Sequence, residues 1–134
     1  MSKKKHKSFH FVMPLGVYPF DVIVSIGQSD KELFKVFTKS NKPFDKEDFE
    51  AALYTGNTCQ ARAVMFSNNV SLLRLRKLPE TAEDFGHVAH EIFHTVTFVM
   101  YKIGCILDIG KSDEAYAYLI QYITENFFSR TRSF

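Results

Sequence analysis

Two histidines and a glutamate stand close together in the sequence His90-Glu91-x-x-His94, inside a predicted helix. Residues four apart lie on the same helix face, so both imidazoles can bind a single ion, and this spacing is typical of zinc. Glu91 would then lie beside a metal-bound water rather than on the metal. Zinc lowers the pKa of such a water to about 7, and a neighbouring carboxylate can accept its proton as the water attacks a carbonyl carbon. The pattern therefore predicts zinc-assisted hydrolysis.

A catalytic zinc site takes three protein ligands and leaves one position for water. Glu114 follows His94 by 20 residues and falls in the first turn of the next predicted helix. The loop 104–111 is short enough to fold that helix back as an antiparallel neighbour, so Glu114 is expected beside the imidazoles. His87, one turn before His90, is read as an extra ligand, an oxyanion donor or a solvated helix-start residue.

Two neighbouring acids compete for the role of third ligand. Asp113 is the alternative to Glu114, and both could instead be first-turn residues that the helix dipole favours. Helical spacing favours Glu114, because the face on which it lies is expected to turn toward the metal helix. That face holds Glu114, Tyr118, Gln121 and Glu125. We expect Tyr118 rather than Tyr116 to supply a phenol that stabilises the tetrahedral intermediate.

Hydrophobic periodicity and turn residues predict the elements that position these side chains. Strands are expected at 21–26, 61–66 and 70–75, and helices at 30–40, from Asp45 to Gly56, at 81–104 and at 112–128. Asn68-Asn69 between the last two strands predicts a β-hairpin, since Asn tolerates the positive φ of tight turns. In the final strand Leu73 alternates with Arg74, which predicts one buried side and one side in water.

The helix that carries the histidines has a clear start, because Thr81 can cap it and Asp84 lies three residues on. Apolar residues around the motif predict that this helix is buried nearly all round. They are Val88, Ala89, Ile92, Phe93, Val96, Val99 and Met100. A buried cluster of hydrogen-bonded polar groups is therefore the alternative to a metal site. The order of elements predicts an α+β domain with a small, mostly antiparallel sheet.

The composition predicts one globular domain. The chain has 134 residues, of which 46% are hydrophobic and 15% aromatic, so a substantial core is expected. Four of the first seven residues are lysine, and we interpret residues 1–8 as a basic, flexible tail before a single domain over 9–134. With a net charge of +2, only weak nucleic-acid contact by this tail is expected. Two distant cysteines predict no disulfide framework, and no segment is typical of a signal peptide or membrane span, so a cytoplasmic protein is expected.

The motif His90-Glu91-x-x-His94, followed by Glu114 on the next helix, resembles that of the gluzincins, the thermolysin-like zinc metallopeptidases. The resemblance covers about residues 60–128. It implies a minimal zincin-like fold, a peptide or protein substrate, and zinc bound by both histidines and the glutamate. It also implies that Glu91 is the general base and that a substrate lies extended along the edge strand of the hairpin.

Residues 113–118 and the small size are also similar to compact HExxH proteins encoded by bacteriophages, which implies a place in the host cytoplasm or the virion. Two features depart from the gluzincin pattern. Tyr118 stands where those enzymes often have an aspartate that orients a ligand histidine, and 134 residues leave no room for their large second lobe. The alternative function is therefore a catalytically weak or inactive zincin-fold module, binding or structural, within a larger phage-type assembly.

Overall fold

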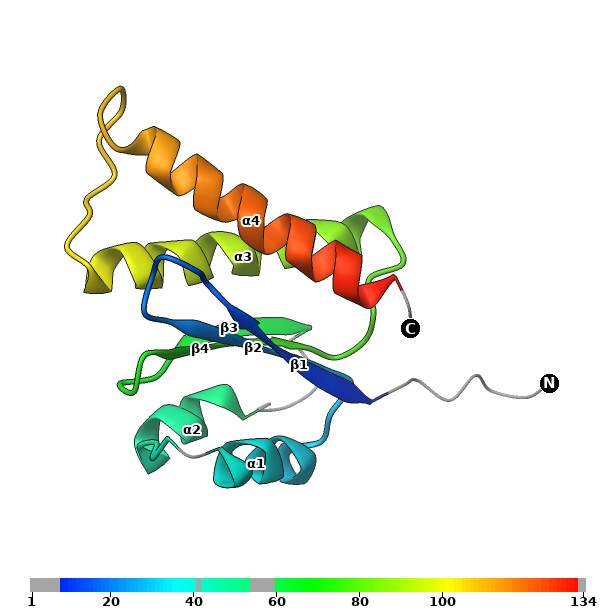
Figure 1. Cartoon of the computed structure of the whole chain (residues 1–134). Coiled ribbons are helices and arrows are strands. Elements are labelled where there is room, and N and C mark those ends of the chain that lie inside the picture. The colour runs from blue at the N-terminus through cyan, green and yellow to red at the C-terminus, as the bar shows by residue number, and fades with distance from the viewer. Residues whose placement is uncertain (1–7, 41, 54–59, 133–134) are drawn as a thin grey trace.

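The computed structural model describes residues 8–40, 42–53 and 60–132. The strands are β1 (Phe9–Pro14), β2 (Asp21–Ile26), β3 (Ala61–Met65) and β4 (Val70–Leu75), and the helices are α1 (Asp30–Lys39), α2 (Lys46–Ala52), α3 (Ala82–Lys102) and α4 (Asp113–Thr131). In this part of the chain they form an α+β domain with a four-stranded sheet between two pairs of helices (Figure 1). Most of the predicted tail lies outside the described residues. None of the helices described is long and apolar enough to cross a membrane.

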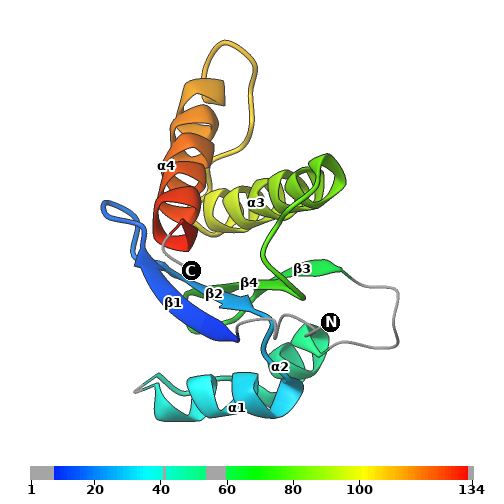
Figure 2. The ribbon, with the colours of Figure 1, turned by 90° about the vertical axis from the view of Figure 1, so that its right-hand side faces the viewer.

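The sheet is mixed. Its strand order is β1-β2-β4-β3, with antiparallel pairs at both edges and the parallel pair β2–β4 in the centre. Because a tight turn cannot join parallel neighbours, the chain crosses from β2 to β4 through α1, α2 and β3. The first two helices cover one face of the sheet, and α3 and α4 cover the other (Figures 1 and 2). The prediction of a mostly antiparallel sheet is confirmed for the two edge pairs, and the central pair departs from it.

The predicted hairpin between β3 and β4 is confirmed. Asn69 has a φ of 63°, the positive value that a tight turn needs. Asn68 Oδ1 accepts the N–H of Val70 at 3.2 Å, and its Nδ2 donates to the carbonyl of Pro43 at 3.0 Å. The turn residues thus stabilise the hairpin and also connect it to the segment that joins α1 to α2.

Strand β1 was not among the predicted strands. It ends at Pro14, and a residue without an N–H is tolerated on an edge strand. The carbonyls of Val12 and Pro14 accept hydrogen bonds from Arg130 at 2.6 Å and from Tyr122 at 2.9 Å, both on α4. Side chains more than 100 positions away therefore help to hold this strand, which is why local sequence signals do not reveal it.

Strand β4 is buried on both sides, so the prediction of a side in water was wrong. Leu73 packs in the core beneath α3 and α4, whereas Leu72 packs in a second core against α1 and α2. Arg74 is also buried, and its side chain is 1% exposed. Side chains of β4 do alternate between the two faces of the sheet, but a central strand between two layers of helices has no face in water.

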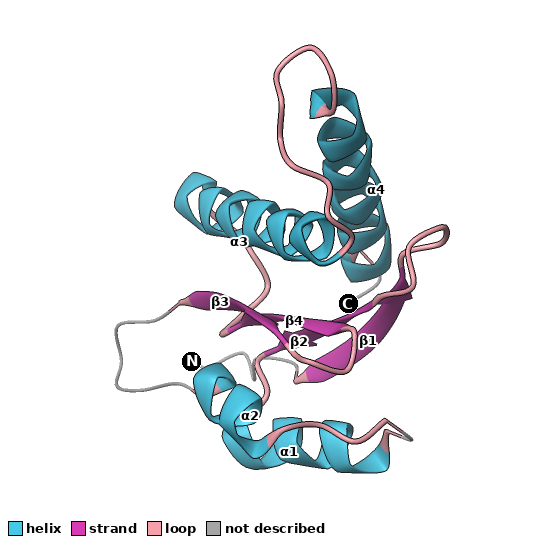
Figure 3. Ribbon diagram, turned by 90° about the vertical axis from the view of Figure 1, so that its left-hand side faces the viewer, coloured by secondary structure: helices cyan, strands magenta, loops and turns pink. Residues whose placement is uncertain are grey.

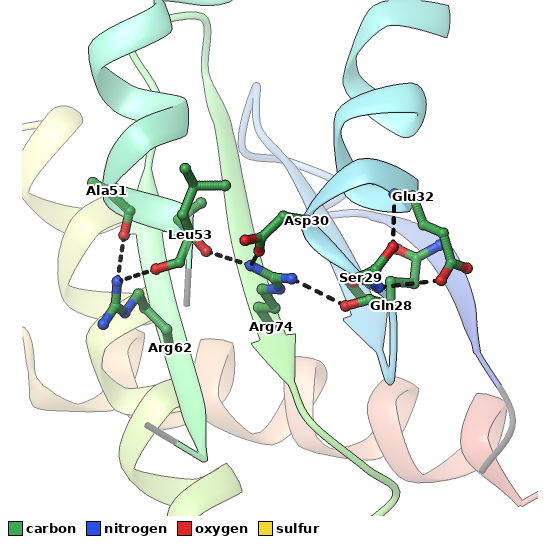
Figure 4. Close-up of polar contacts among 10 residues, drawn as sticks. Gln28, Ser29, Asp30, Glu32, Ala51, Leu53, Arg62 and Arg74 are labelled. Atoms are coloured by element: carbon green, nitrogen blue, oxygen red, sulfur yellow. Dashed lines mark hydrogen bonds and ion pairs between the residues drawn. The ribbon is translucent and has the colours of Figure 1, made fainter. Parts of the chain in front are cut away.

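Arg74 joins β4 to helices α1 and α2 (Figure 4). Its guanidinium donates to the carbonyl of Ala52 at 2.7 Å and to that of Gln28 at 3.0 Å. The same group lies 2.7 Å from a carboxylate oxygen of Asp30. One buried cation therefore connects the central strand, the start of α1 and the end of α2.

A second arginine completes the end of α2. Arg62 donates to the carbonyls of Ala51 and Leu53, each at 2.8 Å (Figure 4). The last carbonyls of a helix lack partners within the helix and carry partial negative charge, so cations stabilise them. The helix ends at Ala52, whereas its predicted end, Gly56, lies outside the described residues.

Helix α3 begins with the predicted capping box. Thr81 Oγ1 accepts the N–H of Asp84 at 3.1 Å. Asp84 Oδ2 accepts the N–H groups of Glu80 at 3.0 Å and of Thr81 at 3.2 Å. The Glu80 N–H first, and then the Thr81 N–H, hold the pKa of Asp84 below its ordinary value of 3.8.

Asp84→Asn is expected to destabilise the protein near neutral pH and much less in acid. A carboxylate whose pKa is lowered by folding stabilises the folded state above its unfolded pKa of 3.8, and this contribution is lost as the pH falls through the lower folded pKa. The difference in urea unfolding between wild type and variant should therefore shrink as the pH falls below 3.8. A difference of constant size would show that the charge of Asp84 contributes nothing.

Candidate metal centre

Helix α3 has a buried face and an exposed face. Its buried residues are Val88, Ile92, Thr95, Val96, Val99 and Met100. His90 and His94 are exposed, and Phe93 is 46% exposed. The prediction of a helix buried nearly all round was therefore wrong, because α4 crosses α3 and leaves much of its outer face open (Figures 1 and 2). The exposure of both histidines also contradicts the alternative of a buried polar cluster.

The two predicted histidine ligands converge on one point. Their Nε2 atoms lie 3.1 Å apart, and the ring centroids are 4.8 Å apart. Two nitrogens bound to one tetrahedral zinc ion at about 2.0–2.1 Å lie about 3.3 Å from each other. A hydrogen bond between neutral imidazoles has a similar length. The pair is thus held near the geometry that two zinc ligands require.

Aromatic side chains flank this pair. The ring of Phe98 stacks on His94, with centroids 6.2 Å apart and planes at 20°. Phe93 lies on another side, with its centroid 6.4 Å from that of His94. The His94 ring therefore has an aromatic neighbour on each of two sides, while its Nε2 lies 3.1 Å from that of His90. Phe98 was missed in the sequence, although its spacing of four from His94 signals contact on a helix.

Glu91 and His87 occupy flanking positions on α3. Glu91 is half-buried, and its carbonyl accepts the hydroxyl of Thr95 at 3.0 Å. His87 Nε2 lies 3.8 Å from a carboxylate oxygen of Glu83, one turn earlier. This contact with Glu83 favours the interpretation of His87 as a helix-start residue over that of an additional ligand.

The structure does not bring Glu114 to the two histidines. Glu114 is exposed in the first turn of α4. Across residues 8–40, 42–53 and 60–132, no group of three or more His, Cys, Asp or Glu side chains is arranged to hold a metal ion. Asp113 caps the preceding loop instead: its Oδ1 accepts the N–H of Gly110 at 2.8 Å. The structure therefore brings together two of the three predicted ligands, His90 and His94.

Helix α4 turns a different face inward from the one predicted. Its buried residues are Tyr116, Leu119, Ile123, Phe127 and Thr131. Tyr118, which shares a face with Glu114, is 67% exposed. The hydroxyl of Tyr116 donates to the carbonyl of Cys105 at 2.6 Å. Burial of each large apolar side chain stabilises the folded protein by about 1.5–3 kcal/mol, so α4 packs with its apolar face against the core and its polar face in water.

Comparisons of the chain with protein-family models, with curated proteins and with solved structures give no match. The α+β architecture is shown by the structure, whereas the zincin fold stays a prediction. The convergence of His90 and His94 follows from their spacing of four on one helix.

Proposed function

We propose that this protein is a zinc-dependent metallopeptidase that hydrolyses a peptide bond. One observation carries the proposal: the Nε2 atoms of His90 and His94 lie 3.1 Å apart on an exposed face of α3. Two imidazoles at this separation fit a tetrahedral zinc ion, and an exposed face admits a peptide. The chain between them supplies Glu91, a carboxylate of the kind that such hydrolysis uses as its base.

Zinc, when bound, polarises the substrate carbonyl and acidifies the attacking water. Glu91 accepts the proton of that water and then delivers it to the leaving amine. Glu114 is the proposed third ligand, and Tyr118 is the proposed phenol that stabilises the tetrahedral intermediate. Since both lie on the exposed face of α4, the proposal requires this face to approach α3 in the zinc-loaded protein.

Elemental analysis of the purified protein is expected to show about one zinc per wild-type chain and none in a His90→Ala/His94→Ala variant, because that variant loses two of the proposed ligands. His87→Ala is the matched control. It removes a histidine that lies one turn earlier on the same helix, 3.8 Å from a carboxylate oxygen of Glu83, and it should keep the metal. A wild-type chain that holds no metal even after incubation with zinc would contradict the proposal.

The third ligand is tested by zinc titration of two further variants. Glu114→Gln is expected to weaken zinc binding by more than about tenfold, since it removes a direct ligand. Asp113→Asn should change it little, because the side chain of Asp113 contacts the N–H of Gly110. Weaker zinc binding in Asp113→Asn, with little change in Glu114→Gln, would make Asp113 the third ligand.

A second candidate function is a zincin-fold binding or structural module, with little or no turnover, in a larger phage-type assembly. The exposed side chains of Ile106 and Ile109, next to α3, favour this candidate because apolar surfaces often mark protein contacts. X-ray absorption of the zinc-loaded protein distinguishes the two functions. Four protein ligands would indicate a structural ion, and an oxygen from water in the fourth position would indicate a catalytic one.

A further inference from the structure

The loop between α3 and α4 (residues 103–112) turns large apolar side chains into solvent. Ile106 is 81% exposed and Ile109 is 90% exposed. With the end of α3 they form what we call the apolar loop surface. It consists of Tyr101, Ile103, Ile106, Leu107 and Ile109. Figures 1 and 3 show this loop standing clear of the sheet, beyond the ends of both helices that it joins.

Hydrogen bonds hold the loop in this conformation. Ser112 Oγ accepts the N–H of Asp108 at 2.7 Å and donates to the carbonyl of Ile106. The hydroxyl of Tyr116 donates to the carbonyl of Cys105 at 2.6 Å. Polar groups thus occupy the inside of the loop, and the aliphatic side chains face outward. Another molecule must therefore cover these side chains to remove them from water.

Charges of both signs accompany the apolar loop surface. Lys102 and Lys111 lie toward its two ends, Asp108 pairs with Lys111 at 3.6 Å, and Glu114 follows on α4. Asp108 and Lys111 neutralise each other within the chain. Lys102, at the end of α3, and Glu114, at the start of α4, carry opposite charges, so that Lys102 of one copy can lie against Glu114 of another across a two-fold axis. An anionic membrane, in contrast, attracts basic segments and repels these carboxylates. The charge pattern therefore favours a second copy of this chain.

We propose that the apolar loop surface is the contact through which two copies of this chain form a two-fold symmetric dimer. A standard interface buries about 800 Å² on each partner. Five large apolar side chains, each between 42% and 90% exposed, can supply the apolar centre of such an interface, and the charged residues beside them its polar rim. The contact goes beyond the proposed hydrolysis and requires no metal ion.

Analytical ultracentrifugation of the full chain tests the dimer. Wild type is expected to dimerise with rising concentration, and Ile106→Asp/Ile109→Asp should raise the dissociation constant at least about a hundredfold, because four carboxylates would meet in an apolar contact. Val17→Asp is the matched control, since Val17 is 92% exposed in the turn between β1 and β2. Figure 2 shows this turn on the other side of α4 from the loop, so the control should dimerise like wild type.

Three results would overturn the proposal. One is a wild-type chain that stays monomeric at every concentration, and another is an equal loss of the dimer in the control. The third is a monomeric chain that co-sediments with vesicles of phosphatidylcholine and phosphatidylserine and loses this binding in Ile106→Asp/Ile109→Asp, which would assign the surface to a membrane. Circular dichroism and thermal unfolding verify that each variant is folded, and Ile106→Ser/Ile109→Ser replaces the aspartate variant if it is not.

Discussion

Replacing Arg74 by methionine is expected to lower the free energy of unfolding by about 2–6 kcal/mol, since two buried carbonyls each lose a donor at about 1–3 kcal/mol. The side chain is 1% exposed and donates to the carbonyls of Ala52 and Gln28, whose residues are themselves buried. Methionine offers these carbonyls no donor, so two hydrogen bonds in a largely buried place are lost. Methionine keeps much of the apolar volume, and the loss therefore measures the charge and its hydrogen bonds. Urea unfolding followed by circular dichroism gives the value.

Arg62→Met is the matched control for this experiment. Arg62 also donates to two carbonyls near the end of α2, each at 2.8 Å, but it is only half-buried. Water can take over its role, and a loss of about 1 kcal/mol is expected. Asp30→Asn should cost about 1 kcal/mol or less, because the Asp30 side chain is 48% exposed. Equal losses for both arginines would show that burial does not set the contribution of Arg74.

Glu91→Gln is expected to retain zinc and to lower peptide hydrolysis by about 10²–10⁴-fold. The amide has nearly the same shape as the carboxylate but cannot accept the proton of the attacking water. Zinc content and turnover of a mixed peptide library, measured on the same metal-loaded sample, separate loss of chemistry from loss of the ion. This prediction depends on the proposed function.

Glu83→Gln is the matched control for the loss of the base. Glu83 lies on the same helix, two turns before Glu91 and beside His87 rather than beside the two proposed ligands, so its replacement should leave turnover unchanged. Full activity in a zinc-loaded Glu91→Gln variant would remove Glu91 from the mechanism. Equal loss in both variants would point to a general disturbance of α3.

Features that depend on a few neighbouring residues could be predicted from the sequence. Thr81 and Asp84 form the expected capping box, and Asn69 adopts the positive φ of the expected turn. His90 and His94 converge because residues four apart on a helix are always neighbours. In each case the energy that decides the geometry comes from contacts within one turn or one helix.

Features that depend on which layer covers a face could not be predicted in this way. The sequence showed that apolar and charged residues alternate around Arg74. Only the packing of α1 and α2 decided that the strand face carrying Arg74 is buried in a core. The parallel pairing of β2 with β4 likewise has no local signal, since the two strands are separated by two helices and a strand. The burial of this face and the pairing of β2 with β4 both depend on the total apolar area that folding removes from water, to which every helix and strand contributes.

The sequence by itself determined the helices, the hairpin and the spacing of the two histidines, because short-range hydrogen bonds and helical geometry specify them. Only the tertiary structure decided that the histidines face solvent and that Glu114 lies on the outer side of α4. The orientation of α4 is set by its apolar residues, among them Leu119 and Ile123, which gain more from the core than a polar face could. The tertiary structure likewise leaves the side chains of Ile106 and Ile109, in the α3–α4 loop, exposed to water.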